Sequence, residues 1–213
     1  MKVVSTNIGA PKTILWRGKE EKTGIYKYPV DSSIFLDIED VQNDHVIDRK
    51  YHGGVDKACY VYAKEHYPYW KKKYPDLEWQ YGMFGENLTI EGFDENVIRI
   101  GSIYKLGNAT VQISRPRQPC YKLGIRFGTQ AILKQFIDSL YSGVYVRVLH
   151  PGSVTIGDRF ILEKESSDTL TIAELNTLLF HYTEDAHKEL AIKALNDPLI
   201  SDSDKKYFRK KIK

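Results

Sequence analysis

From the start of the chain to about residue 165, apolar side chains recur at every second position. The clearest runs cover residues 34–38, 109–114 and 144–148. A period of two places successive side chains on opposite faces of a strand, and glycines such as Gly107 and Gly143 separate the runs. The pattern predicts a mainly β domain over residues 1–165, built as an antiparallel sandwich or barrel.

Two helices are expected to interrupt this β pattern. The first spans about residues 63–74, and Pro68 falls in or near its first turns. The second spans about residues 129–139, where Ile132 and Phe136 belong to a set of apolar side chains at helical spacing. The sequence therefore predicts a β domain with inserted helices.

A different pattern occupies residues 166–213, where three helices are expected. Thr171 with Glu174 three positions later is typical of a capping box at a helix start, and Ser201 opens the third helix. A three-helix unit this short has difficulty burying a core of its own. We expect it to pack on the β domain or, in a homodimer, on another copy of the chain. Its basic tail, which ends at Lys213, is interpreted as a solvated face.

Composition narrows the class of protein. The 213 residues are 42% hydrophobic and 12% aromatic, which is typical of a globular chain. With 31 basic and 28 acidic residues the net charge is +3, too balanced to indicate a nucleic-acid partner. Two cysteines form no disulfide framework, and neither a signal-peptide core nor a membrane-spanning apolar run is present. We expect a cytoplasmic protein with no membrane partner.

The segment SRPRQPCYKL, at residues 114–123, carries the densest chemistry. Each of its two prolines fixes its own φ and favours extended geometry in the residue before it. A stiff connection that continues neither a helix nor a central strand is therefore expected to present Cys120. Arg115, Arg117 and Lys122 favour a thiolate, which is a nucleophile and a soft metal ligand. The alternative is that Cys120 is a small buried apolar residue.

The segment DRKYHGGVDK, at residues 48–57, combines paired glycines with cations. Gly53 and Gly54 allow successive backbone N–H groups to approach an anion, and Lys50 and Lys57 suit a phosphate. The alternative is a charged hairpin loop whose glycines serve only the turn.

Three further residues complete the set of candidates. His52 is interpreted either as an acid–base group or as a structural hydrogen-bonding residue, and no histidine or cysteine stands near it at zinc-ligand spacing. Cys59 lies in an apolar context and is expected in the core. The segment GMFGENLT, at residues 82–89, is expected to turn into a strand, and its Asn87 can both donate and accept hydrogen bonds.

These three segments, in this order, resemble the MOSC domain, the module named after the carboxy-terminal part of molybdenum-cofactor sulfurases. The matching stretches are KYHGGVDK at residues 50–57, FGENL at 84–88 and PRQPCYKL at 116–123. The resemblance is closest to a small stand-alone bacterial group that includes the 6-hydroxylaminopurine-resistance protein and carries a C-terminal three-helix domain. It spans almost the whole chain and is most specific in the cysteine segment.

The resemblance implies a MOSC-type β-barrel and a bound molybdenum cofactor, a pterin dithiolene with a phosphate tail and an oxo-molybdenum centre. Cys120 would supply the protein thiolate to the metal, and His52, Asn87 or Glu86 would deliver protons. We expect Arg117 and Lys50 to face solvent, so that replacing either leaves the fold nearly intact. The cofactor-binding candidates are the cations and glycines of the two basic segments: Lys50, Gly53, Gly54, Lys57, Arg115 and Arg117.

The leading functional hypothesis from this resemblance is a reductase of N-hydroxylated compounds, including base analogues such as 6-hydroxylaminopurine. Electrons would come from a separate redox protein, because no Gly-x-Gly-x-x-Gly segment opens a helix for a flavin or a nicotinamide. A second hypothesis is a non-enzymatic carrier of the molybdenum cofactor, or of a sulfur bound on Cys120. A third is a structural or interaction protein with an empty pocket.

Overall fold

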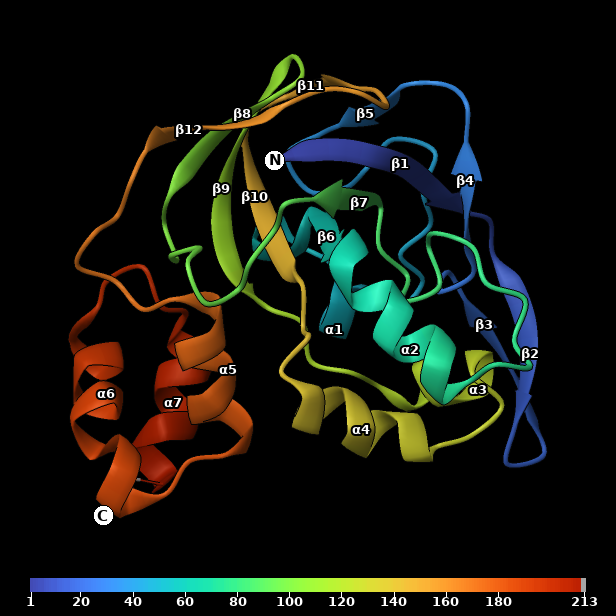
Figure 1. Cartoon of the computed structure of the whole chain (residues 1–213). Helices are drawn as coiled ribbons and strands as arrows, with labels where there is room; N and C mark the ends of the chain where they lie inside the picture. The colour runs from blue at the N-terminus through green and yellow to red at the C-terminus, as the bar shows by residue number, and fades with distance from the viewer. Residues whose placement is uncertain (212–213) are drawn as a thin grey trace.

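The computed structural model describes residues 1–211, so Ile212 and Lys213, the end of the expected basic tail, lie outside the described residues. Its centre is an eight-stranded sheet in the order β12-β8-β9-β10-β6-β7-β1-β4 (Figure 1). Two small two-stranded sheets, β2-β3 and β11-β5, accompany it. The strands are β1 (Lys2–Gly9), β2 (Lys12–Trp16), β3 (Lys19–Thr23), β4 (Lys27–Val30), β5 (Ile34–Leu36), β6 (Cys59–Ala63), β7 (Leu88–Glu91), β8 (Ile103–Leu106), β9 (Ala109–Pro116), β10 (Val144–His150), β11 (Gly152–Val154) and β12 (Phe160–Lys164).

The sheet is mixed, which corrects the antiparallel expectation. Strands β6 and β7 pair in parallel, because the chain returns between them through helix α2 (Tyr67–Lys73) before β7 begins. The strand order is open at β12 and β4, and the expected closed barrel is not confirmed. One isolated bridge joins Lys2, at the start of β1, to Arg159 just before β12.

Helices cover the sheet at the places where the apolar spacing indicates them. The expected helix at residues 63–74 is a 3-10 turn followed by α2, with Pro68 in the first turn, where its missing N–H is not needed. The expected helix at 129–139 is α4. None of the helices in the described part of the chain has the length and apolar character needed to cross a bilayer. The 3-10 turn before α2 is η2 (Lys64–His66), and α4 spans Ala131–Ser139. The other helices are α1 (Arg49–His52), η1 (Val55–Lys57), α3 (Tyr121–Arg126), α5 (Ile172–Phe180), α6 (Glu184–Asn196) and α7 (Asp202–Lys211).

The stiff connection expected over residues 114–123 is shorter than predicted, because its first residues belong to a central strand and its last residues to a helix. Strand β9 lies between β8 and β10 and continues through Pro116, which pairs with Val144. Pro116 is tolerated because β8 pairs with β9 only as far as Gln112, so at the proline β9 has a neighbouring strand on one side alone, as an edge strand has. Helix α3 then begins at Tyr121, so only residues 117–120 are irregular.

A bulge in β9 sets the direction in which the chain leaves the sheet. The register with β10 shifts at Ser114, between the pairs made by Ile113 and Arg115. The Ser114 hydroxyl lies 2.8 Å from the backbone oxygen of Tyr145 and 2.6 Å from that of Asp56. Because a bulge bends its strand, Ser114 turns the end of β9 towards residues 48–57.

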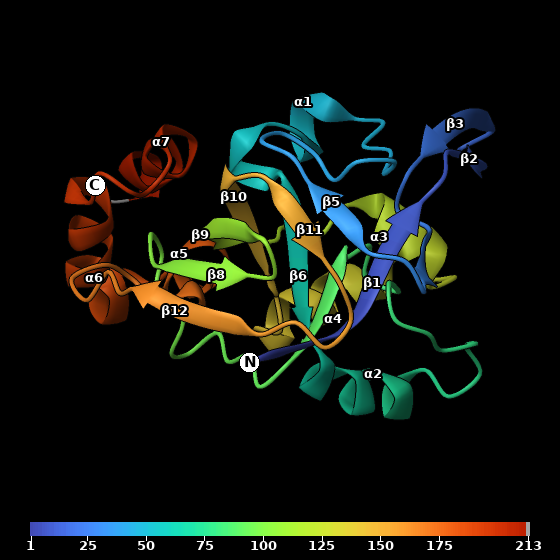
Figure 2. The same ribbon diagram turned by 90° about the horizontal axis from the view of Figure 1, so that it is seen from above.

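The apolar core continues from the sheet into the C-terminal helices. Ile172, Leu175 and Leu178 of α5 are buried in the same contiguous cluster as Val111 of β9. The figures place α5, α6 and α7 beside the β8–β12 end of the sheet (Figures 1 and 2). A separate domain over residues 166–213 therefore stays a prediction, since the helices share the core of the sheet.

The start of α5 is set by its N-terminal cap. The Thr171 side chain accepts from the Glu174 N–H at 3.1 Å, and the Glu174 carboxylate accepts from the Thr171 N–H at 2.8 Å. The expected capping box is confirmed, and its two bonds satisfy backbone donors that the first turn leaves unpaired.

A buried ion pair joins the last helix to the end of β9. Arg115 donates to the Asp204 carboxylate at 2.7 Å, and their side chains are only 12% and 4% exposed. Ser201, at the start of α7, contributes a hydroxyl 2.8 Å from the same carboxylate. Helix α7 is therefore fixed against the strand that leads to Cys120.

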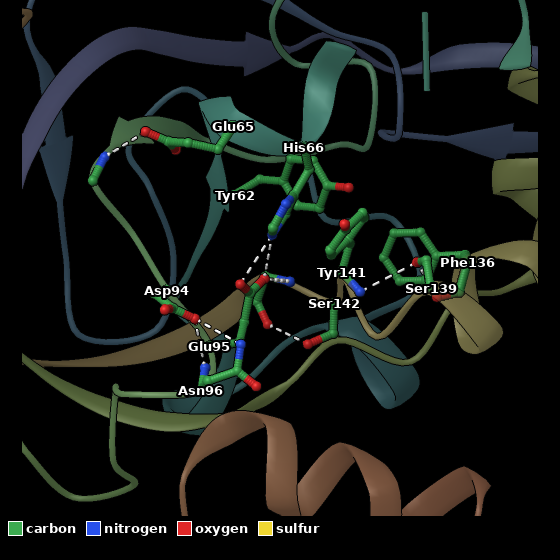
Figure 3. A network of polar contacts seen from close by, with 12 residues as sticks. Tyr62, Glu65, His66, Asp94, Glu95, Asn96, Phe136, Ser139, Tyr141 and Ser142 are labelled. Carbon is green, nitrogen blue, oxygen red and sulfur yellow. Dashed lines mark hydrogen bonds and ion pairs between the residues drawn. The ribbon is translucent and has the colours of Figure 1, made fainter. Parts of the chain in front are cut away.

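A second buried pair fixes loops on another side of the sheet. His66 points its Nε2 at Glu95, 2.9 Å from both carboxylate oxygens (Figure 3). Glu95 also accepts from the Gly143 N–H at 3.0 Å, and the His66 ring stacks on Tyr141. The loop after β7 is thereby held to the segment that leads into β10.

The Arg115–Asp204 pair yields a stability prediction. Asp204→Asn should lower the free energy of unfolding by about 3 kcal/mol, because it leaves a buried guanidinium without its counter-charge. Glu184→Gln is the control, since Glu184 and Lys188 form an exposed pair on α6 and its loss should change stability by less than about 0.5 kcal/mol. Urea unfolding followed by circular dichroism measures both, and equal effects of the two substitutions would contradict the assignment.

Candidate functional site

Two hollows meet at the cysteine segment. The inner hollow, with a volume of about 80 Å³, is lined in part by residues 23–25, by Lys27 and by residues 45–48. The outer hollow, about 680 Å³, is bounded by α1, the β9–α3 connection and helices α5 and α7. Six residues line both: Asp48, His52, Lys57, Cys120, Lys122 and Tyr145.

Cys120 occupies the N-cap position of α3, and its side chain is partly exposed to both hollows. The β2–β3 hairpin holds this helix in place. Trp16 stacks on Tyr121 with ring centroids 5.0 Å apart, and Lys122 donates to the Lys22 carbonyl at 3.3 Å. Contacts on the two residues after Cys120 thus fix the position from which its sulfur reaches the hollows.

Arg117 is buried, which corrects the expectation that it faces solvent. Its side chain donates to the Phe84 carbonyl and lies over the Tyr60 ring, 5.0 Å from the centroid. Burial by itself lowers the pKa of Arg117, but the neighbouring Tyr60, Tyr145 and Cys120 raise it above its usual value. Arg117 is therefore a permanent positive charge in the wall of the inner hollow.

His52 stands where the two hollows meet. Burial lowers its pKa from 6.5 to about 4, and the positive charges of Arg117 and Lys57 act in the same direction. The imidazole is consequently neutral at pH 7, with one nitrogen that donates and one that accepts.

The three remaining candidate cations line the outer hollow. Lys57 donates to the Tyr51 carbonyl, and burial followed by the charge of Arg115 lowers its pKa. Lys50 is exposed, with its ammonium 5.5 Å from the centroid of the Tyr51 ring. Arg115 is the partner of Asp204 described above. Cations from two distant segments are thus brought together beside Cys120.

The paired glycines line neither hollow. They separate α1 from η1, so residues 48–57 form two helical turns and not the hairpin loop considered from the sequence. A Cβ at Gly53 would lie 3.1 Å from the Cα of Arg49, and Gly54 has a φ of +95°, which favours glycine. Their part in binding an anion stays a prediction, while their part in this tight turn is visible.

Asn87 lines the inner hollow, but its amide already has partners. It accepts from the Tyr60 N–H at 3.3 Å and donates to Asp44 at 3.0 Å. Glu86 is fully buried and accepts from the backbone of Gly82 at 2.7 Å and of Phe84 at 3.1 Å. Glu86 thus organises the turn before β7 and lies outside the lining of both hollows.

Sequence reasoning missed a buried ion pair beside the inner hollow. Lys27 lines this hollow, and its ammonium lies 2.5 Å from the Asp44 carboxylate. Burial raises the pKa of Asp44, but the attraction to Lys27 outweighs it and the pKa is lowered. No motif signals this pair, because its members are 17 positions apart in unrelated segments. The α7 residues Asp204 and Tyr207, which line the outer hollow, were missed for the same reason.

Within residues 1–211, no group of three or more His, Cys, Asp or Glu side chains is arranged to hold a metal ion. Cys59, the other cysteine, is buried in the core as expected, and burial raises its pKa to about 12. Cys120 is therefore the cysteine that lines the hollows.

The MOSC domain model matches residues 48–160, a stretch that holds all three motif segments. The chain belongs to the MOSC domain family.

Relatives extend the likeness over almost the whole chain. It is 37% identical to the uncharacterized protein YflK of Bacillus subtilis over 98% of this chain and 93% of that protein. The crystal structure of YiiM from Geobacillus stearothermophilus superposes with a TM-score of 0.79 at 32% identity, covering 100% of this chain and 99% of that one. A protein named reductase from Gibberella moniliformis is 36% identical over 68% of this chain, but this covers only 26% of that protein.

The exposure of the two cysteines predicts different reactivity. Iodoacetamide should modify Cys120 in the native protein and leave Cys59 untouched, because Cys59 is buried and protonated below about pH 12. Mass spectrometry of the native chain should show one added group, which Cys120→Ser abolishes and Cys59→Ser retains. Rapid modification of Cys59 in the folded chain would contradict this placement.

His52 should stay neutral well below the usual range of a histidine. Because its pKa is about 4 when folded and about 6.5 when unfolded, the unfolded chain binds the proton first. The contribution of His52 to stability is thus complete above pH 6.5 and is lost as the pH falls towards 4. An imidazole NMR titration, with His52→Gln to assign the signal, should show a midpoint near 4; a midpoint near 6.5 contradicts the placement.

Proposed function

We propose that this MOSC protein is a molybdenum-cofactor-dependent reductase of N-hydroxylated compounds such as 6-hydroxylaminopurine. Membership of the MOSC family and the likeness to a protein named reductase support an oxidoreductase-like role of MOSC type. The observation that carries the proposal is the place of Cys120, partly exposed where two hollows meet and surrounded by cations.

The residues present fit a molybdenum cofactor in three respects. Cys120 offers a sulfur, a soft donor, and because the described residues hold no group of three or more His, Cys, Asp or Glu side chains suited to a metal, most other ligands of the metal would come with the cofactor. The outer hollow, about 680 Å³, falls in the usual size range of cofactor pockets. Its lysines and arginine complement the negative charge of a phosphate.

Each of these residues has a part in holding the cofactor. Cys120 would ligate the metal through its sulfur. Lys50 and Lys57, which line the outer hollow, would attract the phosphate, and Arg115 would be shared between the cofactor and Asp204. Arg117, whose guanidinium is bound to the Phe84 carbonyl, would act through its fixed charge beside the sulfur.

Reduction of an N-hydroxylated amine consumes two electrons and two protons, breaks the N–O bond and releases the amine and water. The bound cofactor supplies the two-electron chemistry, and its electrons come from a separate redox protein. His52 is the side chain of this chain best placed to move a proton, because it lines both hollows. As a neutral imidazole it donates from one nitrogen while it accepts at the other.

The proposal predicts a selective defect in Cys120→Ser. Serine keeps the shape of cysteine but replaces a soft, easily ionised sulfur with a hard hydroxyl. The variant, produced in a host that makes the cofactor, should fold normally and lose reduction of 6-hydroxylaminopurine by at least about 100-fold. Cys59→Ser is the control: it should keep its activity per folded molecule and lose about 1–3 kcal/mol of stability, because it buries a hydroxyl.

Turnover with an artificial reductant and molybdenum analysis of the purified protein separate the alternatives. Full activity of cofactor-loaded Cys120→Ser contradicts the ligand assignment. A wild-type chain that retains molybdenum but reduces no N-hydroxylated compound is a carrier, and a chain that retains no molybdenum is neither.

A further inference from the structure

The outer hollow has a wall that lies outside the stretch matched by the MOSC model. That model ends at residue 160, whereas Phe180 of α5 and Ser203, Asp204 and Tyr207 of α7 line the hollow. The ion pair between Arg115 and Asp204 fixes this wall to the strand that leads to Cys120. The C-terminal helices thus face the same space as the sulfur.

The aromatic side chains of this hollow differ in how much of their rings they present. Tyr121 is stacked on Trp16, and Tyr145 is buried against Tyr60. Tyr51 and Tyr207 are the rings with large exposed fractions, 60% and 40%. These two are therefore the most exposed of the aromatic residues that line the outer hollow, where Phe180 is half-buried.

Tyr207 is also held in a fixed orientation. Its hydroxyl donates to the Leu179 carbonyl at 2.7 Å, so the polar end of the ring is tied to α5. Its neighbour Phe208 is buried in the core, and Asp204, one helical turn earlier, is bound to Arg115. A ring whose hydroxyl is tied down while its surface stays exposed offers apolar contact and not hydrogen bonding.

We propose that Tyr207 is a specificity-determining residue, whose ring stacks on planar heteroaromatic substrates in the outer hollow. The inference rests on the proposed function and deepens it, because it assigns recognition of the substrate ring to a C-terminal helix. Stacking requires a flat π-system, so an N-hydroxylated purine gains from Tyr207 and a small aliphatic N-hydroxylated compound does not.

The test compares variants of the cofactor-loaded full chain. Tyr207→Ala and Tyr207→Leu remove the ring, the second with most of its bulk retained, and Tyr207→Phe removes only the hydroxyl. Tyr69→Ala is the matched control, because Tyr69 is also 40% exposed on a helix but lies outside both hollows. Circular dichroism establishes that each variant is folded.

Two readouts are measured. Isothermal titration calorimetry gives the affinity for 6-methylaminopurine, a planar base that has no N–O bond to reduce. Steady-state kinetics compares 6-hydroxylaminopurine with N-hydroxyurea. Loss of the ring should weaken purine binding and raise the KM for 6-hydroxylaminopurine by roughly tenfold, the effect of one stacked base. Turnover of N-hydroxyurea by the ring-less variants, and all properties of Tyr69→Ala, should match the wild type. Tyr207→Phe keeps the ring but loses the bond that orients it, so its purine affinity should lie between those of the wild type and Tyr207→Ala.

The inference is overturned if the ring-less variants bind 6-methylaminopurine as tightly as the wild type, if the wild type does not bind it, or if both substrates are lost equally. Failure of the proposed function gives a different result. A wild-type chain that reduces neither substrate overturns the reductase proposal, while the binding experiment still decides whether Tyr207 recognises the ring.

Discussion

The site depends on the burial of one cation, Arg117. Its guanidinium binds the Phe84 carbonyl and lies over the Tyr60 ring, so it holds the cysteine segment against the turn before β7. The same charge, together with burial, keeps His52 neutral. Because a buried guanidinium requires partners for its donors, the cysteine segment and the turn before β7 are constrained to meet at this point. This constraint also sets the position of Cys120, which is three residues later in the chain.

Local sequence patterns predicted much of this molecule, but they did not predict which distant residues pair with one another. The alternation in β9 and β10, the cap at Thr171 and the burial of Cys59 were readable because each depends on neighbours in sequence. The parallel pairing of β6 with β7 was not, since strand direction depends on the path of the connection. The continuation of β9 through Pro116 was missed because the sequence does not show that β8 ends its pairing with β9 at Gln112, which leaves one side of β9 without a neighbouring strand at the proline.

The candidate site shows the same division. The motif cations were recognised from the sequence, but their burial and their partners were not. Arg117 is buried, and Arg115 is bound to Asp204, 89 positions away. The inner pair of Lys27 and Asp44 has no sequence signature at all. A hollow is a property of the surfaces that surround it, so the part of its wall formed by α5 and α7 became visible only when the chain was folded.

The proposed function depends above all on a bond between the Cys120 sulfur and the molybdenum of a bound cofactor. X-ray absorption at the molybdenum K-edge tests it most directly, because it counts the sulfur atoms around the metal without reference to turnover. Wild-type protein and Cys120→Ser, both purified with molybdenum, would be compared under the same conditions. If Cys120 ligates the metal, the variant has one sulfur neighbour fewer. An unchanged number of sulfur neighbours would contradict it.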